Sequence, residues 1–333
     1  MFTRIFWIRL IKSQLKHIAI KIFFTLFIYV TSVSAETIKI GLGSCLDQNY
    51  PQPIWKSVEN EDISYFVFLG DNVYGDSLTG SLKKMERAYT KQKSLLPDFL
   101  DEIEIFSIWD DHDYGINDGG MDYKNRELAE DMFLKFWEIP KSDIRHKRDG
   151  IYFSQDVLFF NKTFKLVFLD TRFFRSELKG QKGKYLKNES KDATILGDVQ
   201  WKWLIDELNQ TFDFLILFSS IQVLPEDHGF EKWGNFPNDR KKLLNMLDQF
   251  KHKTILVSGD RHRGGLYKKN GIYEITASSL NKPGSFAFET DKFLIGSTYP
   301  EENYGLLEIS ANIIEVKLKD KSGKSLNSVK LDY

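Results

Sequence analysis

The stretch "SYFVFLGDNVYGDS", residues 64–77, joins an apolar run to a polar turn. Residues 65–69 are aromatic or aliphatic without interruption, which predicts a strand buried on both faces. The strand should end near Gly70, because Gly-Asp pairs and Asn are typical of turns. Asp71 and Tyr74 would then follow the carboxyl end of a buried strand. Taken alone, this motif is as consistent with an ordinary turn as with a functional site.

The same pattern of an apolar run followed by polar residues recurs along the chain. Similar apolar runs occupy residues 37–43, 104–109, 164–169, 212–218 and 253–259. Helical patterns lie between them at residues 81–96, 124–138, 198–210 and 239–250, and Asp198 suits the N-cap of the third. Residues 271–280, 304–310 and 312–320 predict strands without intervening helices. The pattern favours an α/β protein with a mixed two-sheet sandwich and helices outside.

Polar side chains follow nearly every one of these strands. In chain order they are Cys45, Asp71, Asp111 with His112, Asp170 with Arg172, Gln222, and Asp260 with His262. Ligands bind at the carboxyl ends of strands in open α/β sheets. A single Asp at such a place is usually a turn former, but the recurrence at six ends is harder to explain by turns. Thiol, carboxylate, imidazole and phenol groups together indicate a metal site.

The last of these motifs has informative spacing. Asp260 and His262 lie two residues apart with glycine on both sides, so in an extended segment both side chains can reach one ion. By contrast His17 lies in the basic N-terminal segment, and His146 and His252 lie among lysines. We expect these three to be solvated.

Residues 1–35 have the features of an export signal. They carry basic but no acidic residues, an apolar run at 22–30, and small residues before Ala35. We therefore predict a signal peptide cleaved after Ala35, the alternative being an uncleaved anchor, although the apolar run is short for a spanning helix. There is no Arg-Arg pair for a twin-arginine route. Residues 36–333 would form one periplasmic or secreted domain without a stable membrane span.

The amino-acid composition argues against some classes of function and limits the roles of the single cysteine. The net charge is −1 and no long basic run follows the leader, which argues against general nucleic-acid binding. Cys45 is the only cysteine, so in an exported protein it should be buried and inert or bound to something. Residues 175–197 are polar and rich in Gly and Lys, which indicates a long surface loop, either a lid or a solvated insertion.

The motifs taken together support a stronger statement. The order G-S-C, G-D-x-x-Y, W-D-D-H-D, L-D-T-R, "SSIQVLPEDHGFEKWGNFP" and S-G-D-R-H resembles the alkaline phosphatase D (PhoD-like) family. That family belongs to the calcineurin-like metallophosphoesterases and is related to the purple acid phosphatases. The resemblance runs from about Gly41 to the strands after residue 270. It implies a metallophosphoesterase-type two-sheet core flanked by helices.

The resemblance also implies roles for individual residues. Asp71 would bridge two metals, with Tyr74 and Cys45 as ligands of a ferric ion. Asp111, Asp260 and His262 would be further metal ligands. His112 would act on the substrate phosphate, and Arg172 would clamp it. Gln222 and His228 are alternative candidates for a substrate-binding position. The implied metals are Fe³⁺ and Ca²⁺, the second being replaceable by another divalent ion.

The expected function is metal-dependent hydrolysis of phosphate monoesters, diesters or both. Two metals can clamp a phosphate group and acidify a bound water, which suits this chemistry. One rival is a specialised phosphodiesterase or phospholipase D-like enzyme acting on lipid or cell-wall polymers. Another is a phosphate- or metal-binding protein of the same fold without turnover. The expected partner is a phosphate-ester substrate, and the sequence does not indicate an oligomeric state.

Overall fold

The computed structural model describes residues 37–285, 287 and 289–333. The signal peptide predicted for residues 1–35 lies outside the described residues. The chain divides into two units, Met1–Thr37 and Ile38–Tyr333, and both large sheets belong to the second. Among the described residues no helix is both long and apolar enough to cross a bilayer.

The first large sheet is built around the stretch at 64–77. Its strands run in the order β15-β14-β13-β1-β2-β3. Strands β1 (Ile38–Gly43), β2 (Tyr65–Leu69) and β3 (Glu104–Ile108) are parallel to one another. Strands β13 (Asn303–Ile309), β14 (Ile313–Asp320) and β15 (Ser325–Asp332) extend the sheet by antiparallel pairing from β1.

The second large sheet has the order β12-β10-β11-β9-β8-β5-β4. Its centre is parallel and consists of β5 (Lys162–Phe168), β8 (Phe214–Phe218), β9 (Thr254–Ser258) and β11 (Ile272–Thr276). Strands β4 (Phe153–Phe159), β10 (Gly264–Lys269) and β12 (Leu294–Tyr299) pair antiparallel around it. The predicted two-sheet α/β fold is confirmed, although β4, β10, β12 and β15 were not predicted.

Successive side chains along a strand point to opposite faces of the sheet, so they pack into different layers of the protein. In β2, Val67 joins the main core cluster, whereas Phe66 belongs to a separate cluster with Trp55. In β5, Leu166 joins the same main cluster as Val67, and Val167 packs with residues of the helices outside the second sheet. Both faces of these strands are therefore buried, which explains their continuous apolar sequences.

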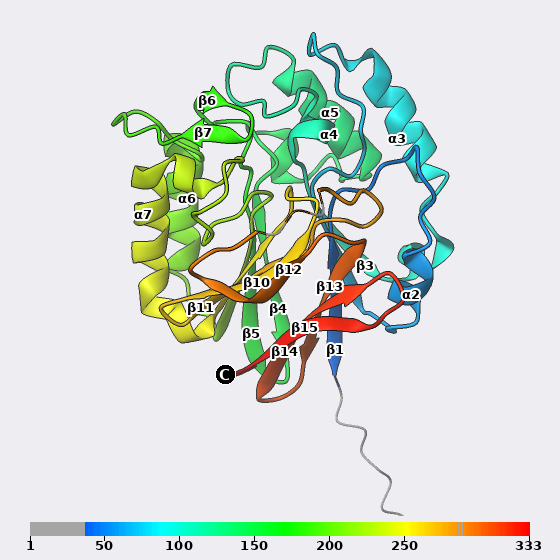
Figure 1. The fold of residues 1–333 in the computed structure, drawn as a ribbon, viewed down its shortest axis with the longest axis vertical. Coiled ribbons are helices and arrows are strands. Elements are labelled where there is room, and N and C mark those ends of the chain that lie inside the picture. Colours follow the sequence, from blue (N-terminus) through cyan, green and yellow to red (C-terminus); the bar gives the residue numbers. More distant parts are fainter. Residues whose placement is uncertain (1–36, 286, 288) are drawn as a thin grey trace, which may run out of the picture. The chain divides into compact units, whose positions relative to one another are not determined.

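Helices cover the outer faces and the loop ends of the sheets (Figure 1). They are α2 (Trp55–Glu59), α3 (Met85–Lys93), α4 (Asp111–Tyr114), α5 (Arg126–Phe136), α6 (Gly197–Leu208) and α7 (Pro237–Leu247). Helix α6 starts one residue before the predicted N-cap, so Asp198 lies in its first turn. The N-cap is Leu196, which makes no side-chain capping hydrogen bond, and the Thr194 hydroxyl accepts the Gly197 N–H at 2.9 Å.

The carboxyl ends of the parallel strands meet where the two sheets converge. Ser44 after β1 forms an isolated parallel bridge with Ser278 after β11. Glycine permits this approach, because a Cβ on Gly259 would lie 2.6 Å from the Ser44 Oγ and 3.0 Å from the Leu69 carbonyl oxygen. The polar residues that come after separate strands in the sequence are thereby brought to one place.

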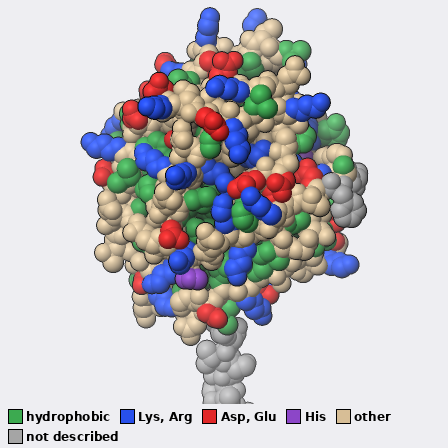
Figure 2. All heavy atoms as spheres, turned by 60° about the vertical axis from the view of Figure 1, so that its left-hand side comes forward, with side chains coloured by type: hydrophobic (Ala, Val, Ile, Leu, Met, Phe, Trp, Pro, Cys, Tyr) green, Lys and Arg blue, Asp and Glu red, His purple; other side chains and the backbone are tan. Residues whose placement is uncertain are grey.

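The segment 175–197 is more ordered than a plain loop. It contains a small hairpin of β6 (Lys179–Gln181) and β7 (Lys184–Leu186). The Tyr185 N–H donates to the Gly229 carbonyl at 2.8 Å, which ties the hairpin to the loop after β8. Figure 2 shows basic and acidic side chains intermixed over one face of the molecule.

Candidate metal centre

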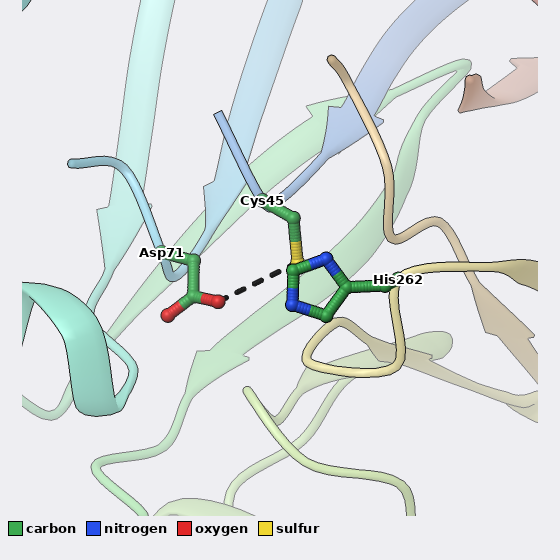
Figure 3. A group of neighbouring side chains, drawn as sticks. All are labelled: Cys45, Asp71 and His262. Carbon is green, nitrogen blue, oxygen red and sulfur yellow. Dashed lines mark hydrogen bonds between the residues drawn. The ribbon is translucent and has the colours of Figure 1, made fainter. Parts of the chain in front are cut away.

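A buried group of possible metal ligands lies at the ends of β1, β2 and β9. Cys45, Asp71 and His262 each offer an atom within 4.8 Å of the others. Figure 3 shows their side chains pointing toward one another from three separate segments. The Cys45 Sγ lies 3.5 Å from the Asp71 Oδ2 and 3.2 Å from the Ser278 Oγ. The only cysteine of the chain therefore belongs to the site.

Tyr74 adds a phenol to this group. Its hydroxyl donates to the Asp71 Oδ2 at 2.9 Å, so the G-D-x-x-Y turn folds its tyrosine back onto its aspartate. The Tyr74 ring lies 4.2 Å from the His112 ring, centroid to centroid. A sulfur, a carboxylate, a phenol and an imidazole thus surround one point.

A second, oxygen-rich group adjoins the first. Asp71 also clusters with Asp111 and His112, and Asp111 clusters with Asp110 and Asp260, again within 4.8 Å. Asp71 and Asp111 each belong to two groups, so the structure brings seven predicted residues together. They are Cys45, Asp71, Tyr74, Asp111, His112, Asp260 and His262.

The three acids of the W-D-D-H-D motif have different surroundings. Asp113 accepts the backbone N–H of Asp110 at 2.6 Å and that of Asn72 at 3.1 Å, so it holds the β2 loop against α4. Asp110 pairs with Arg172 behind the site. Asp111 faces the cavity and accepts the Asp118 N–H at 2.7 Å.

His112 is oriented by a residue that the sequence patterns did not single out. Its Nδ1 lies 2.8 Å from the Asp76 Oδ1, and Asp76 belongs to the same turn as Asp71. Burial disfavours the charged imidazole, but Asp111 and Asp71 act more strongly together and raise the His112 pKa to about 10. The second Asp in "GDNVYGD" was the available signal.

His262 differs from His112 because its surroundings favour the neutral imidazole. Its Nδ1 lies 2.6 Å from the Lys282 carbonyl oxygen, and because a carbonyl only accepts, Nδ1 must carry the proton. Its Nε2 is then left with the lone pair. Burial lowers the His262 pKa to about 4, which keeps the ring neutral as a metal ligand requires. Ser278 also accepts the His262 N–H at 2.9 Å.

Four residues of the centre also have an uncommon backbone conformation. Cys45, Asp71, Asp260 and His262 have positive φ angles of 55°, 51°, 67° and 52°. Such angles are uncommon for residues with a Cβ and cluster at functional sites. At each of these residues the backbone leaves the extended conformation of the preceding strand, so the side chain does not continue the in–out alternation of that strand and is directed toward the centre.

The donor set fits a pair of metal ions. Burial raises the pKa values of the Cys45 thiol and of the Asp71 and Asp260 carboxyls, and neighbouring acids raise them further. His112 and Arg261 offset only part of this effect at Asp71 and Asp260, so the described side chains do not fully compensate the buried acids. Within the described part of the chain, the Asp110 Oδ2 is also buried without a hydrogen-bond partner. Bound cations would supply positive charge to these buried acids and a partner to the Asp110 oxygen.

A cavity of about 190 Å³ opens onto the centre. Besides Asp71, Asp111, His112, Asp260 and His262, its lining includes Asp118, Lys182, Phe230, Glu231, Arg261, Arg263, Gly284, Ser285 and Glu289. Lys182 is the turn residue of the β6–β7 hairpin, so the segment 175–197 contributes directly to the wall.

The surroundings of Arg172 differ from those expected of a phosphate clamp. The L-D-T-R motif suggested a phosphate clamp, but its side chain has no exposed surface and does not line the cavity. The guanidinium lies 2.5 Å from the Asp110 Oδ1 and 2.6 Å from the Glu231 Oε2. Its donors are thus directed to buried carboxylates rather than to a ligand.

Gln222 and His228 also lie outside the cavity lining. The Gln222 side chain is buried and its Nε2 donates to the Thr276 Oγ1 at 2.7 Å. His228 lines a different cavity of about 930 Å³ with Lys232 and Arg240. The structure places neither of them to complete the centre.

Comparison with known proteins agrees with this geometry. A family model described as PhoD-like phosphatase matches residues 40–293, which include every residue of the centre. The chain belongs to the PhoD-like phosphatase family. The predicted family and enzyme class are thereby confirmed, and this PhoD-like protein is a metal-dependent phosphoesterase.

Solved structures share the fold of this PhoD-like protein at low sequence identity. The structure of PhoD matches with a TM-score of 0.66 and 14% identity, covering 89% of this chain and 72% of that one. GAP50, the anchor in the inner membrane complex of Plasmodium, matches with a TM-score of 0.60 and 12% identity over 89% of each chain. No curated protein matches the sequence.

A purple acid phosphatase, PPD1 from yellow lupin seeds, is a further structural neighbour. Its TM-score is 0.61 at 13% identity, and the match covers 90% of this chain and 54% of that one. The three likenesses establish the fold, and GAP50 is described as an anchor rather than as an enzyme. Fold alone therefore does not decide between catalysis and binding.

Proposed function

We propose that this PhoD-like protein is an exported metal-dependent phosphoesterase that hydrolyses phosphate monoesters, diesters or both. The observation that carries the proposal is the convergence of two groups of possible metal ligands that share Asp71, with Asp71, Asp111, His112 and His262 lining one cavity. A protein that had become only an anchor would not need to retain both groups together with an oriented His112.

The donors favour different metals in the two groups. Cys45, Tyr74 and His262 with Asp71 would hold a ferric ion, because thiolate, phenolate and imidazole suit iron. Asp71, Asp111 and Asp260 would hold calcium or another hard divalent ion through oxygen. When bound, two such ions would supply charge neutralisation on the phosphate and a water ionised near neutral pH.

The chain's own residues have separable tasks in this proposal. Asp71 lies between the groups, so its two carboxylate oxygens can serve both. His112 engages Asp76 through Nδ1, which leaves Nε2 to contact the substrate phosphate or the leaving oxygen. Asp113 fixes the turn that carries Asp71 against the helix that carries His112.

Export is part of the proposal and rests on the sequence of residues 1–35. The basic segment, the apolar run and the small residues before Ala35 support a cleaved signal. Mass measurement of the protein recovered from the periplasm or medium should give a chain beginning at Glu36. A full-length chain retained in the membrane fraction would instead favour the uncleaved anchor.

Metal analysis combined with turnover tests the activity. The purified protein should contain iron and a divalent ion and should hydrolyse bis(4-nitrophenyl) phosphate, 4-nitrophenyl phosphate or both. Bound metal without turnover of either ester would support the non-catalytic rival. Turnover restricted to lipid or cell-wall phosphodiesters would support the specialised enzyme.

His112→Ala should lower kcat while the metal content and the fold are retained. A single general acid or base contributes on the order of 10²–10⁴-fold to rate. Steady-state kinetics and metal analysis on the same preparation measure the two properties together. If the variant loses metal and keeps its rate per occupied site, His112 is a ligand rather than a catalytic group.

Cys45 should be protected from thiol reagents in the metal-loaded protein and should become reactive after chelation. A bound metal occupies the thiolate, whereas an inert core thiol would stay unreactive in both states. The signal is unambiguous because the chain has one cysteine. Cys45→Ser should retain the fold and lose activity, and a fully active serine variant with equal reactivity in both states would mean that Cys45 only fills space.

A further inference from the structure

Arg261 is a cation on the cavity wall that has no role in the chemistry proposed for the centre. It follows Asp260 directly and lines the same cavity as Asp111 and His112. Its side chain is only 5% exposed, yet its Nε has no hydrogen-bond partner among the residues that the structure describes. A buried guanidinium with a free donor can accept a further anionic partner at little additional cost.

The other donors of Arg261 show which kind of group the site accepts. Its Nη2 lies 2.7 Å from the Glu289 Oε1, so a carboxylate already occupies this position. The guanidinium also lies 4.6 Å from the centroid of the Phe230 ring, which holds its plane in place. Glu289 remains 23% exposed at the side chain, so it lies near the solvent side of the wall.

Two neighbouring arginines are held by more contacts than Arg261. Arg172 is enclosed by the buried carboxylates of Asp110 and Glu231. Arg263 donates through Nη1 to the Ala287 carbonyl and the Thr298 hydroxyl, and through Nη2 to the Ser285 carbonyl. The Arg263 Nε also lies 3.4 Å from the Glu289 Oε2. Arg263 therefore fastens the loop that carries Glu289, whereas Arg261 keeps its Nε without a hydrogen-bond partner among the described residues.

We propose that Arg261 binds a non-bridging oxygen of the phosphate ester and that Glu289 occupies its guanidinium until substrate displaces it. The inference rests on the proposed function and names the residue that takes the role first predicted for Arg172. The planar fork of arginine matches phosphate as it matches carboxylate, so a substrate phosphate can replace Glu289 directly.

A purely structural ion pair between Arg261 and Glu289 predicts different changes in phosphate affinity from a pair in which Glu289 competes with phosphate. If Arg261 and Glu289 only hold the loop, removing either charge breaks the same contact and should weaken phosphate binding in the same direction. If Glu289 competes with phosphate, Arg261→Gln should weaken binding and Glu289→Gln should strengthen it. Glutamine keeps the size and one acceptor oxygen of the glutamate.

The experiment measures binding of inorganic phosphate to the metal-loaded protein by calorimetry, with metal content and thermal stability recorded for each variant. Arg261→Gln should raise the phosphate Kd by roughly 10- to 100-fold, the range for a charge-assisted hydrogen bond. Glu289→Gln should lower it several-fold, because apparent affinity follows the fraction of sites available. Arg261→Lys should lie between wild type and Arg261→Gln.

Arg145→Gln is the matched control. Arg145 is also a buried arginine paired with an acid, Asp143 at 2.9 Å, but it does not line this cavity. The phosphate Kd of Arg145→Gln should equal that of the wild type. Shifts of the same sign in Arg261→Gln and Glu289→Gln, or no phosphate binding by the wild type, would overturn the inference.

Failure of this inference can be separated from failure of the proposed function. Opposite shifts in phosphate Kd without hydrolysis of any ester would support the binding role of Arg261 and refute catalysis. Ester hydrolysis with an unchanged KM and phosphate Kd in Arg261→Gln would support catalysis and refute the binding role.

Discussion

Replacing Asp71 by asparagine should abolish phosphoesterase activity and remove both metals. Asp71 belongs to the sulfur-containing and the oxygen-rich ligand groups, and it accepts the Tyr74 hydroxyl. A neutral amide has one acceptor oxygen and cannot serve two cations as a carboxylate does. Because metals contribute several kcal/mol to the transition state, kcat/KM should fall by at least about 10³-fold.

Metal analysis and kinetics on one preparation of Asp71→Asn check this result. Asp156→Asn is a suitable control, since Asp156 is 47% exposed, pairs with Lys165 and lies outside the cavity lining. The control should keep its metal and its rate. Full metal content with near-normal turnover in Asp71→Asn would refute the bridging role.

Replacing Arg172 by methionine should destabilise the protein by about 3–5 kcal/mol, the cost of breaking a buried ion pair. The side chains of Arg172, Asp110 and Glu231 have 0%, 0% and 1% exposure. Methionine would fill similar space but leave the Asp110 carboxylate without its cation. Glu231 would keep its second partner, Arg175, at 2.8 Å.

Urea unfolding of the metal-loaded variant measures this loss, with the midpoint and slope compared with wild type. Arg145→Met provides the comparison, because its partner Asp143 is 25% exposed and solvent can compensate the lost pair. We expect a clearly smaller effect there. Unchanged stability combined with weaker phosphate binding in Arg172→Met would restore the clamp predicted from the L-D-T-R motif.

The strands and helices with strong periodic patterns could be predicted from the sequence. Runs such as residues 65–69 and 214–218 are buried on both faces, so their composition alone marks them. The strands that were missed are of another kind. Strand β4 is exposed or partly buried along most of its length, and the β6–β7 hairpin is short and polar. Their pairing depends on neighbours far along the chain.

The residues of the centre could also be predicted, because each directly follows a strong strand signal. What failed was the direction of individual side chains. Arg172 follows β5 as Asp260 follows β9, yet one turns into a buried ion cluster and the other toward the cavity. Asp76, Ser278 and Arg261 carry local interactions that no spacing rule distinguishes from turns or solvated charges.

The sequence by itself determined which residue types stand at the carboxyl ends of the parallel strands, because burial and turn formation are local requirements. The tertiary structure alone decided which of them share one point. That depends on the convergence of two sheets at Ser44 and Ser278 and on the close approach allowed by Gly259. Positive φ angles at Cys45 and Asp260 then turn the side chains inward, at a strain that only the surrounding packing can hold.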